Sequence, residues 1–275
     1  MQTPHQQLDA LLTELDPKKS LVFLTGAGVS AESGIPTFRG KGGYWTVGSK
    51  VYQPQQMATW LNFEKQPREV WRWYLYRRGV CRAGAPNAAH RALVELERAR
   101  PAVFHLITQN IDGLHRIAGN SADRTYEIHG TGEEMRCAER CTDARYPIPE
   151  GVKDKAQDDP LPDAEYALLC CPRCGGLARP HVLWFDEYYE EELYRSNTAM
   201  IAAHTASVMV VAGTSGATSL PVQAVTVALK AGAVLIDINP NPNPFRELAD
   251  QYYRGLSLRG SATEWMPEVV QRLKG

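Results

Sequence analysis

The chain has 275 residues, 44% of them hydrophobic, so it can bury a substantial core and form one large domain plus a small one. Its 30 basic and 31 acidic residues leave a formal net charge of −1, which excludes a general electrostatic attraction to nucleic acid or to an anionic membrane. No apolar run approaches the ~20 residues of a membrane span, so we expect a cytoplasmic protein with neither nucleic acid nor a membrane as a partner.

The first predicted elements are a helix over residues 7–15 and a buried strand over residues 21–24, which ends in a glycine turn. Gly26, Gly28 and Ala31 match the loose G-x-G-x-x-G/A pattern of a dinucleotide site, in which main-chain N–H groups and a helix N-terminus receive phosphates. A plain strand-to-turn glycine pair explains this motif equally well on its own. The acidic ribose-binding residue expected ~20 positions later is missing, so the chain would hold a cofactor differently from a dehydrogenase.

Residues 40–52 are rich in Gly, Lys, Ser and aromatic residues, which is typical either of a lid over the glycine turn or of an exposed connector. The next helix is expected over residues 64–80 and is unusually aromatic. Tyr74 and Arg77 lie three positions apart and share a helix face, where a phenol and a guanidinium could bind a carboxylate. The alternative is a packed aromatic helix with a solvated arginine edge, which this stretch alone favours.

A helix over residues 87–100, capped by Asn87, precedes a series of strand-like runs. Each run ends in small or polar residues, and helical segments lie between most of them, including residues 219–230, 244–253 and about 267–273. In an open parallel sheet the carboxyl ends of the strands line one edge, where ligands bind. The pattern therefore predicts an α/β fold whose polar strand ends converge on one cleft. The predicted strands are residues 103–107, 126–128, 182–185, 208–212, 234–238 and 256–258.

Five of the six cysteines are clustered between Cys137 and Cys174, which suits a metal site in a reducing compartment better than a disulfide framework. Two close pairs, Cys137 with Cys141 and Cys171 with Cys174, are typical of a structural zinc site with four thiolate ligands, and Cys170 is then spare. Unrelated buried thiols are the alternative, although free cysteines rarely cluster in this way. A catalytic zinc is disfavoured because no histidine or carboxylate replaces a thiol.

Together these stretches resemble the sirtuins, the NAD-dependent protein deacylases, over nearly the whole chain. Tyr74 and Arg77 fall on the Tyr-x-x-Arg signature of the subgroup that removes acidic acyl groups. The chain is thus most similar to bacterial-like sirtuins of the desuccinylase and demalonylase type (class III). The matching blocks are GAGVSAESGIPTFR at residues 26–39, TQNIDGLH at 108–115, HG at 129–130, the cysteine pairs, CPRCGGLARPHV at 171–182 and GTS at 213–215.

The resemblance implies a single catalytic domain over residues 1–275. It would contain a Rossmann-like parallel sheet with helices on both faces, a small zinc-binding module and a helical insertion. The large lobe would comprise approximately residues 1–39, 81–130 and 180–275. The small lobe would combine the helical insertion at approximately 40–80 with the zinc module at approximately 131–179.

The resemblance also implies roles for individual residues. His129 would be the base that activates a ribose hydroxyl, since a neutral imidazole suits proton transfer at physiological pH, and Asn110 would be the second catalytic residue. The expected ligands of the structural zinc are the four cysteines named above. The expected substrate-binding residues are Tyr74, Arg77, Phe185, Asp186 and Glu187. The expected NAD-binding residues are Gly26, Ala27, Gly28, Ser33, Ile35, Phe38, Arg39, Gln109, Asn110, Ile111, Asp112, His129, Gly213, Thr214, Ser215, Asn239 and Ala262.

Two features depart from the family pattern, and both touch the expected substrate loops. Asp186 stands where sirtuins usually have glycine, which adds a negative charge where a substrate peptide would lie, and the loop after Ser215 is one residue longer. We expect an enzyme that transfers an acyl group from protein lysine to ADP-ribose and prefers an acidic acyl group to acetyl. The alternatives are an ADP-ribosyltransferase or NAD hydrolase on the same fold, and a non-catalytic NAD sensor. The histidines expected in the core are His90, His105, His115 and His181.

Overall fold

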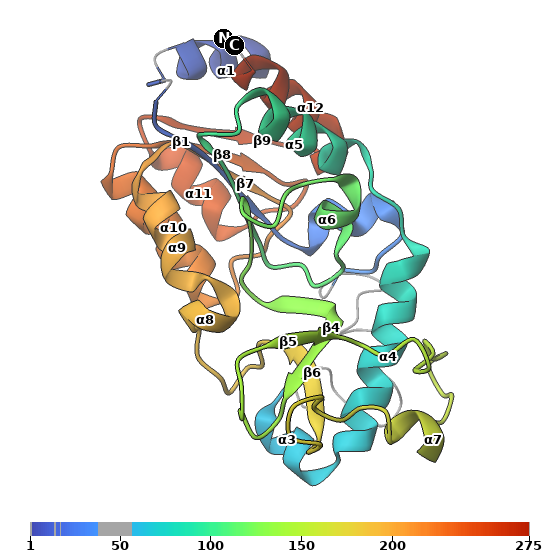
Figure 1. The fold of residues 1–275 in the computed structure, drawn as a ribbon. Helices are drawn as coiled ribbons and strands as arrows, with labels where there is room; N and C mark the ends of the chain where they lie inside the picture. Colours follow the sequence, from blue (N-terminus) through green and yellow to red (C-terminus); the bar gives the residue numbers. More distant parts are fainter. Residues whose placement is uncertain (1, 14, 17, 38–56, 275) are drawn as a thin grey trace.

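A six-stranded parallel sheet forms the centre of the larger part of the molecule (Figure 1). The computed structural model describes residues 2–13, 15–16, 18–37 and 57–274. The strand order β3-β2-β1-β7-β8-β9 places β1 beside β7, where the order of the strands reverses, and Phe23 of β1 pairs with both Leu106 and Val210. The strands are β1 (Ser20–Thr25), β2 (Phe104–Thr108), β3 (Thr125–Glu127), β7 (Ala206–Ala212), β8 (Val234–Ile238) and β9 (Gly255–Leu258).

Helices cover both faces of this sheet, which explains why its strands are continuous apolar runs. Leu21 and Phe23 of β1 point into the core beneath one layer of helices, and Val22 and Leu24 point into the core beneath the other. The first layer contains α1 (Pro4–Thr13), α5 (Ala88–Ala99) and α12 (Ala262–Leu273). The second contains α9 (Ser196–His204), α10 (Ser219–Lys230) and α11 (Pro244–Gln251).

A three-stranded antiparallel sheet, in the order β5-β4-β6, has a separate core of its own. This sheet packs against α4 (Figure 1). The buried Trp71 of α4 donates an indole hydrogen bond of 2.8 Å to the carbonyl of Ala178. The elements here are β4 (Gly130–Cys137), β5 (Arg145–Pro147), β6 (Ala178–Val182), α3 (Trp60–Lys65), α4 (Pro67–Ala83) and α7 (Asp163–Tyr166). The remaining elements are the 3₁₀ helix η1 (Ala27–Ser33), α6 (Leu114–Ala118) and α8 (Glu191–Tyr194).

The predicted α/β class and the parallel sheet with helices on both faces are confirmed, but one predicted strand is wrong. The run at residues 182–185 does not join the parallel sheet, because Val182 is the last residue of β6 and β6 pairs antiparallel with β4. An apolar run of this length carries no information about which sheet it joins. The predicted lid at residues 40–52 lies outside the described residues, and the division into two lobes stays a prediction.

The two largest differences between predicted and observed helices occur at prolines. The helix predicted over residues 64–80 is two helices, α3 and α4, because Pro67 is the first residue of α4 and the preceding Gln66 is held outside the helical region (φ −147°, ψ 63°). The last helix begins at Ala262 rather than near Pro267, and the side chain of Ser261 caps it by accepting a hydrogen bond from the N–H of Glu264. Pro267 lies inside that helix rather than at its start.

The first and last helices lie next to each other at one end of the molecule (Figure 1). Arg272 of α12 donates a hydrogen bond of 2.5 Å to the carboxylate of Asp9 in α1. Trp265 of α12 contacts His5 of α1 in a tilted arrangement, with the ring centroids 5.2 Å apart. Among the described residues, no helix combines the length and the apolar character needed to span a membrane.

Candidate active site

The glycine turn after β1 lies directly against the loop after β7, at the point where the strand order reverses. The N–H of Gly28 donates to the carbonyl of Gly213 at 2.8 Å, and Gly213 has a positive φ of 62°. A Cβ atom at Gly28 would lie 2.7 Å from the Cα of Gly213, and one at Gly26 would lie 2.7 Å from the Cβ of Thr214. Glycine is therefore required here by close backbone approach. The turn leads into a 3₁₀ helix that begins at Ala27, where the dinucleotide motif predicts an α-helix.

The polar residues after β2 connect the ends of three neighbouring strands. The Asn110 amide donates to the carbonyl of Gly26 at 3.1 Å and to the hydroxyl of Ser30 at 3.2 Å. The carboxylate of Asp112 accepts a hydrogen bond of 2.7 Å from Ser30, and burial raises the pKa of Asp112. Gln109 donates to the hydroxyl of Thr214, after β7, at 2.8 Å. The sequence prediction that these strand ends meet at one place is confirmed.

His129 follows β3 and faces the same edge of the sheet. Its Nδ1 lies 3.1 Å from the carbonyl oxygen of Gln109, and since a carbonyl only accepts, we assign the proton of the neutral ring to Nδ1. The other nitrogen, Nε2, then carries a lone pair, and it lies 3.0 Å from the hydroxyl of Tyr189. The ring is half-buried, and desolvation lowers the pKa of His129 to about 4, so the ring is neutral at physiological pH and its unprotonated nitrogen is able to accept a proton.

Of the remaining predicted NAD-binding residues, some lie beside the central loops and others contact different parts of the protein. Asn239 lies beside the central loops, because its amide donates to the carbonyl of Thr214 at 3.1 Å. The hydroxyl of Ser33 instead accepts a hydrogen bond of 2.9 Å from Asn87, and Ile35 packs with Cys81 and Leu114. Ser215 is exposed and Ala262 is buried at the start of α12. Phe38 and Arg39 lie outside the described residues.

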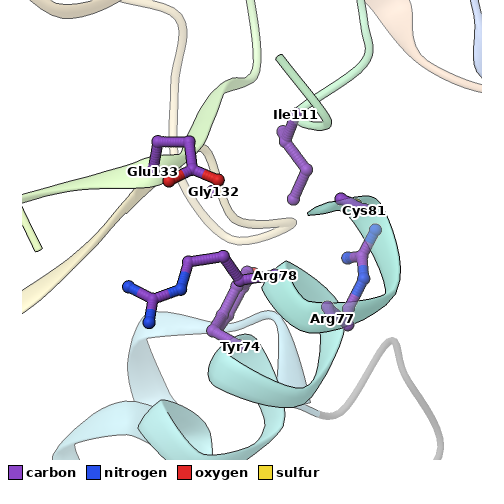
Figure 2. Close-up of a pocket in the computed structure, with 7 residues that line it drawn as sticks. All are labelled: Tyr74, Arg77, Arg78, Cys81, Ile111, Gly132 and Glu133. Carbon is purple, nitrogen blue, oxygen red and sulfur yellow. The ribbon is translucent and has the colours of Figure 1, made fainter. Parts of the chain in front are cut away.

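Tyr74 and Arg77 line a small pocket between α4, β4 and the loop after β2 (Figure 2). The pocket is completed by Arg78, Cys81, Ile111, Gly132 and Glu133. The hydroxyl of Tyr74 accepts a hydrogen bond of 2.8 Å from the indole of Trp184, and burial raises the pKa of Tyr74 to about 12. Arg77 is only 6% exposed, and its guanidinium lies 4.9 Å from the centre of the Trp73 ring.

Asp186 and Phe185 hold the loop after β6 against α3. The carboxylate of Asp186 accepts hydrogen bonds from the N–H groups of Trp60 (2.8 Å) and Leu61 (3.1 Å), in the first turn of that helix. The N–H of Phe185 donates to the carbonyl of Ala58 at 3.0 Å, and the Phe185 side chain is 60% exposed. The negative charge that distinguishes Asp186 from the usual glycine is therefore bound by the protein's own backbone.

Glu187 lies at the centre of a buried ionic cluster. Its carboxylate accepts hydrogen bonds from both terminal nitrogens of Arg179 and from the N–H of Trp184, the latter at 2.9 Å. Arg136 approaches the same carboxylate at 3.4 Å. The guanidinium of Arg179 also lies 3.4 Å from the centre of the Trp184 ring. These contacts fix the position of the loop relative to β6.

The four predicted zinc ligands are brought together beside the small sheet, at the end of β4. Their sulfur atoms all lie within 4.8 Å of one another, with 3.7 Å between Cys137 and Cys174 and 3.6 Å between Cys141 and Cys171. Four thiolates at tetrahedral corners, each ~2.3 Å from a zinc ion, are ~3.8 Å apart, so the donor set fits zinc. Cys170 is not part of the cluster and pairs by its backbone with Leu177.

Tyr189 is the residue at this site that the sequence analysis missed. It lies two residues after the expected substrate loop, but nothing in its sequence context relates it to His129, which is 60 positions away. The four histidines expected in the core are confirmed as buried or half-buried. Of these, His115 lies nearest the glycine turn and bonds the hydroxyl of Thr25 at 3.0 Å.

The chain is similar to known proteins in both sequence and fold. A protein named NAD-dependent protein deacylase from Leptospira interrogans is 38% identical over 258 residues, which cover 94% of each chain. A protein of the same name from Aeropyrum pernix is 41% identical over 254 residues, which cover 92% of this chain and 91% of that protein. The solved complex of a Sir2 homologue with NAD has a TM-score of 0.77 at 37% identity and covers 97% of this chain and 93% of that one.

A second solved structure, a mutant Sir2 homologue in complex with ADP-ribose, has a TM-score of 0.78 at 36% identity and covers 98% of this chain and 96% of that one. The Sir2 family matches residues 26–219, which include the glycine turn, His129 and all four zinc-binding cysteines. The family match, the relatives and the shared fold lead to one conclusion: this chain belongs to the Sir2 family.

Proposed function

We propose that this protein is an NAD-dependent protein deacylase that transfers an acyl group from protein lysine to ADP-ribose and releases nicotinamide. The observation that carries the proposal is the convergence of the Gly26–Gly28 turn, Asn110, Asp112 and a neutral His129 at the switch point between β1 and β7. Relatives named NAD-dependent protein deacylase support it, as do Sir2 homologue structures bound to NAD and ADP-ribose.

Each group at this edge has a physical task in that reaction. The glycine turn allows a pyrophosphate to approach main-chain N–H groups that a Cβ atom would block. NAD supplies a ribose carbon that can accept the acyl oxygen as nicotinamide leaves. His129, with its proton on Nδ1, presents Nε2 to take a proton from a ribose hydroxyl. Asn110 and Asp112, both largely buried, would place polar groups beside the nicotinamide of bound NAD and keep bulk water out.

We propose that the acyl group enters the pocket of Tyr74 and Arg77 and that an acidic acyl group is preferred. Arg77 places a positive charge in a largely desolvated pocket, and Tyr74, held by Trp184, offers a hydroxyl proton to the same ligand (Figure 2). Two neighbouring charges form ion pairs, Glu133 with Arg82 and Arg78 with Asp154. A carboxylate at the end of an acyl chain would complement Arg77.

The experiment that tests the reaction uses NAD with matched acetyl, succinyl and unmodified lysine peptides. We expect nicotinamide release to depend on an acylated peptide and to be lost in His129→Ala. Release that is equally fast without any acylated peptide would instead support an NAD hydrolase or ADP-ribosyltransferase. Binding of NAD without any release would support a non-catalytic sensor.

The acyl preference is tested separately with Arg77→Met. Loss of a hydrogen bond to a charged group costs ~1.5–3 kcal/mol, so kcat/KM for the succinyl peptide should fall roughly 10- to 150-fold, with a much smaller loss for the acetyl peptide. Arg72→Met is the matched control, because Arg72 lies on the same helix and is paired with Glu69. Equal losses on both peptides would refute carboxylate recognition by Arg77.

The four cysteines would hold one structural zinc ion, and no catalytic step requires it. We also propose a cytoplasmic location, which is supported by the need of these thiols for a reducing compartment. The two proposed lobes would then be the large sheet with its helices and the small sheet with α3, α4 and the zinc module.

A further inference from the structure

The lone pair of His129 that the reaction needs is engaged by another side chain in the free protein. Tyr189 places its hydroxyl 3.0 Å from Nε2, and the two rings are inclined by only 32° with their centres 6.0 Å apart. Because Nδ1 is bound to the carbonyl of Gln109, Nε2 is the acceptor and the phenol is the donor. This contact lies beside Gln109, at the sheet edge where NAD is proposed to bind.

An imidazole nitrogen has one lone pair in the plane of the ring, so it accepts one strong hydrogen bond at a time. A ribose hydroxyl that is to lose its proton to Nε2 must donate along the same direction as Tyr189 does. The two donors therefore exclude each other. Tyr189 has to leave Nε2 before His129 can act as a base.

The surroundings of Tyr189 indicate what holds it in place. Its ring packs against the core that contains Ile128 and Leu220, and its hydroxyl also lies within reach of Thr218, just before α10. Thr218 in turn donates to the side chain of Gln109 at 3.3 Å, and the carbonyl of Gln109 holds Nδ1 of His129. Gln109 thus links the contacts of Thr218 to those of His129.

Tyr189 belongs to the loop between β6 and α8, which also contains Phe185 and Asp186. The loop is anchored at Ala58 and at the first turn of α3 through Phe185 and Asp186, and at Arg179 through Glu187. The next residue, Tyr188, is 86% exposed, so the loop presents one tyrosine to solvent and the other to His129. A ligand that displaces this loop segment would withdraw the Tyr189 hydroxyl from Nε2.

We propose that Tyr189 is a positioning residue for His129. In the free enzyme it holds the imidazole with Nε2 directed into the cleft, and it yields that nitrogen when NAD and the acylated peptide are both bound. The inference rests on the proposed function, since it assumes that His129 is the base. Under this proposal, Nε2 of His129 becomes available as a base only when a bound ligand moves the loop that carries Tyr189.

A spectroscopic test examines the contact itself, without turnover. Histidine is labelled with ¹⁵N in the side chain, and the His129 resonances are assigned with His129→Ala. In Tyr189→Phe, which keeps the ring and removes only the hydroxyl, the Nε2 resonance should move toward that of a nitrogen without a hydrogen-bond donor. In the wild type, addition of ADP-ribose with an acetyl-lysine peptide should change the same resonance. Tyr188→Phe is the matched control and should leave it unchanged.

A kinetic test measures the consequence for substrates. Removing one hydrogen bond of ~0.5–1.5 kcal/mol from the free enzyme alone should raise kcat/KM for the acylated peptide roughly 2- to 12-fold in Tyr189→Phe, through a lower KM with kcat unchanged. A thermal melt confirms that the variant is folded.

A tenfold or greater fall in kcat would overturn the proposal and make Tyr189 a proton relay. An Nε2 resonance that is the same in Tyr189→Phe and wild type would also overturn it. Absence of any peptide-dependent nicotinamide release by the wild type would refute the proposed function instead, and the resonances would still decide whether Tyr189 holds Nε2 and yields it to the ligands.

Discussion

The ionic cluster around Glu187 allows a prediction of how much one buried carboxylate contributes to stability, compared with the exposed carboxylate of Glu190. Glu187→Ala removes the carboxylate that binds Arg179, which is 1% exposed, and Arg136, which is 5% exposed. Both guanidinium groups would remain buried after the change. Three residues further along, Glu190 binds Arg140 on the surface at 2.6 Å, with side-chain exposures of 33% and 50%. The two glutamates make the same kind of pair in different dielectric surroundings.

The burial of the partners decides the expected magnitudes. Breaking a buried pair by removing one partner costs ~3–5 kcal/mol, because an uncompensated charge stays out of water. An exposed pair contributes only ~0.2–1 kcal/mol. At roughly 2–3 °C per kcal/mol for a chain of this size, Glu187→Ala should lower the melting temperature by ~6–15 °C. Glu190→Ala should lower it by no more than ~3 °C.

Thermal unfolding followed by circular dichroism measures both variants under the same conditions. Glu187→Gln should fall between wild type and Glu187→Ala, because its amide oxygen still accepts a hydrogen bond from Arg179. The reasoning would be refuted if the Glu187→Ala and Glu190→Ala variants melted within 2 °C of each other. That result would mean that the stacking on Trp184 and the other hydrogen-bond acceptors are enough to stabilise the buried charge of Arg179 without Glu187.

Three further predictions concern zinc, NAD and pH. Cys171→Ser should lose stoichiometric zinc and unfold the small sheet, whereas Cys170→Ser should retain the metal, as measured by metal analysis; a metal-free wild type of full stability would contradict the site. Gly28→Ala should cost ~1–3 kcal/mol of stability and weaken NAD binding at least tenfold by calorimetry, because its Cβ would lie 2.7 Å from Gly213; unchanged affinity would exclude the turn from the NAD site. Burial lowers the pKa values of several histidines from 6.5 to about 3–4, so the unfolded chain binds more protons over this range. Stability should therefore fall as the pH is lowered from 6.5 toward 4, and a midpoint in urea that is constant over this range would contradict the burial. These histidines are His90, His105, His129 and His181.

The parallel strands and the glycine turn could be predicted because local sequence determines them. A strand buried on both faces must be an apolar run, and its polar end must lie at the ligand-binding edge, so Gln109, His129 and Gly213 could be placed near one another. The sheet to which residues 182–185 belong could not be predicted, since an apolar run is equally compatible with a parallel and an antiparallel neighbour.

The roles of Asp186 and Tyr189 could not be read from the sequence for a different reason. Asp186 binds the backbone of α3, which lies 125 and 126 positions earlier, and Tyr189 binds His129, which lies 60 positions earlier. Such contacts depend on how two loops pack, and no local pattern encodes them. The charge of Asp186 therefore seemed to oppose a bound peptide, whereas the structure uses it to cap a helix.

The pairing of α1 with α12 has a practical consequence for protein engineering. Because Asp9 and Arg272 are hydrogen-bonded, a short flexible linker could join the two ends of the chain without disturbing the sheet. New ends could then be opened at an exposed surface loop. Such a circularly permuted enzyme would allow a reporter to be fused beside a chosen loop while the new linker keeps α1 and α12 next to each other.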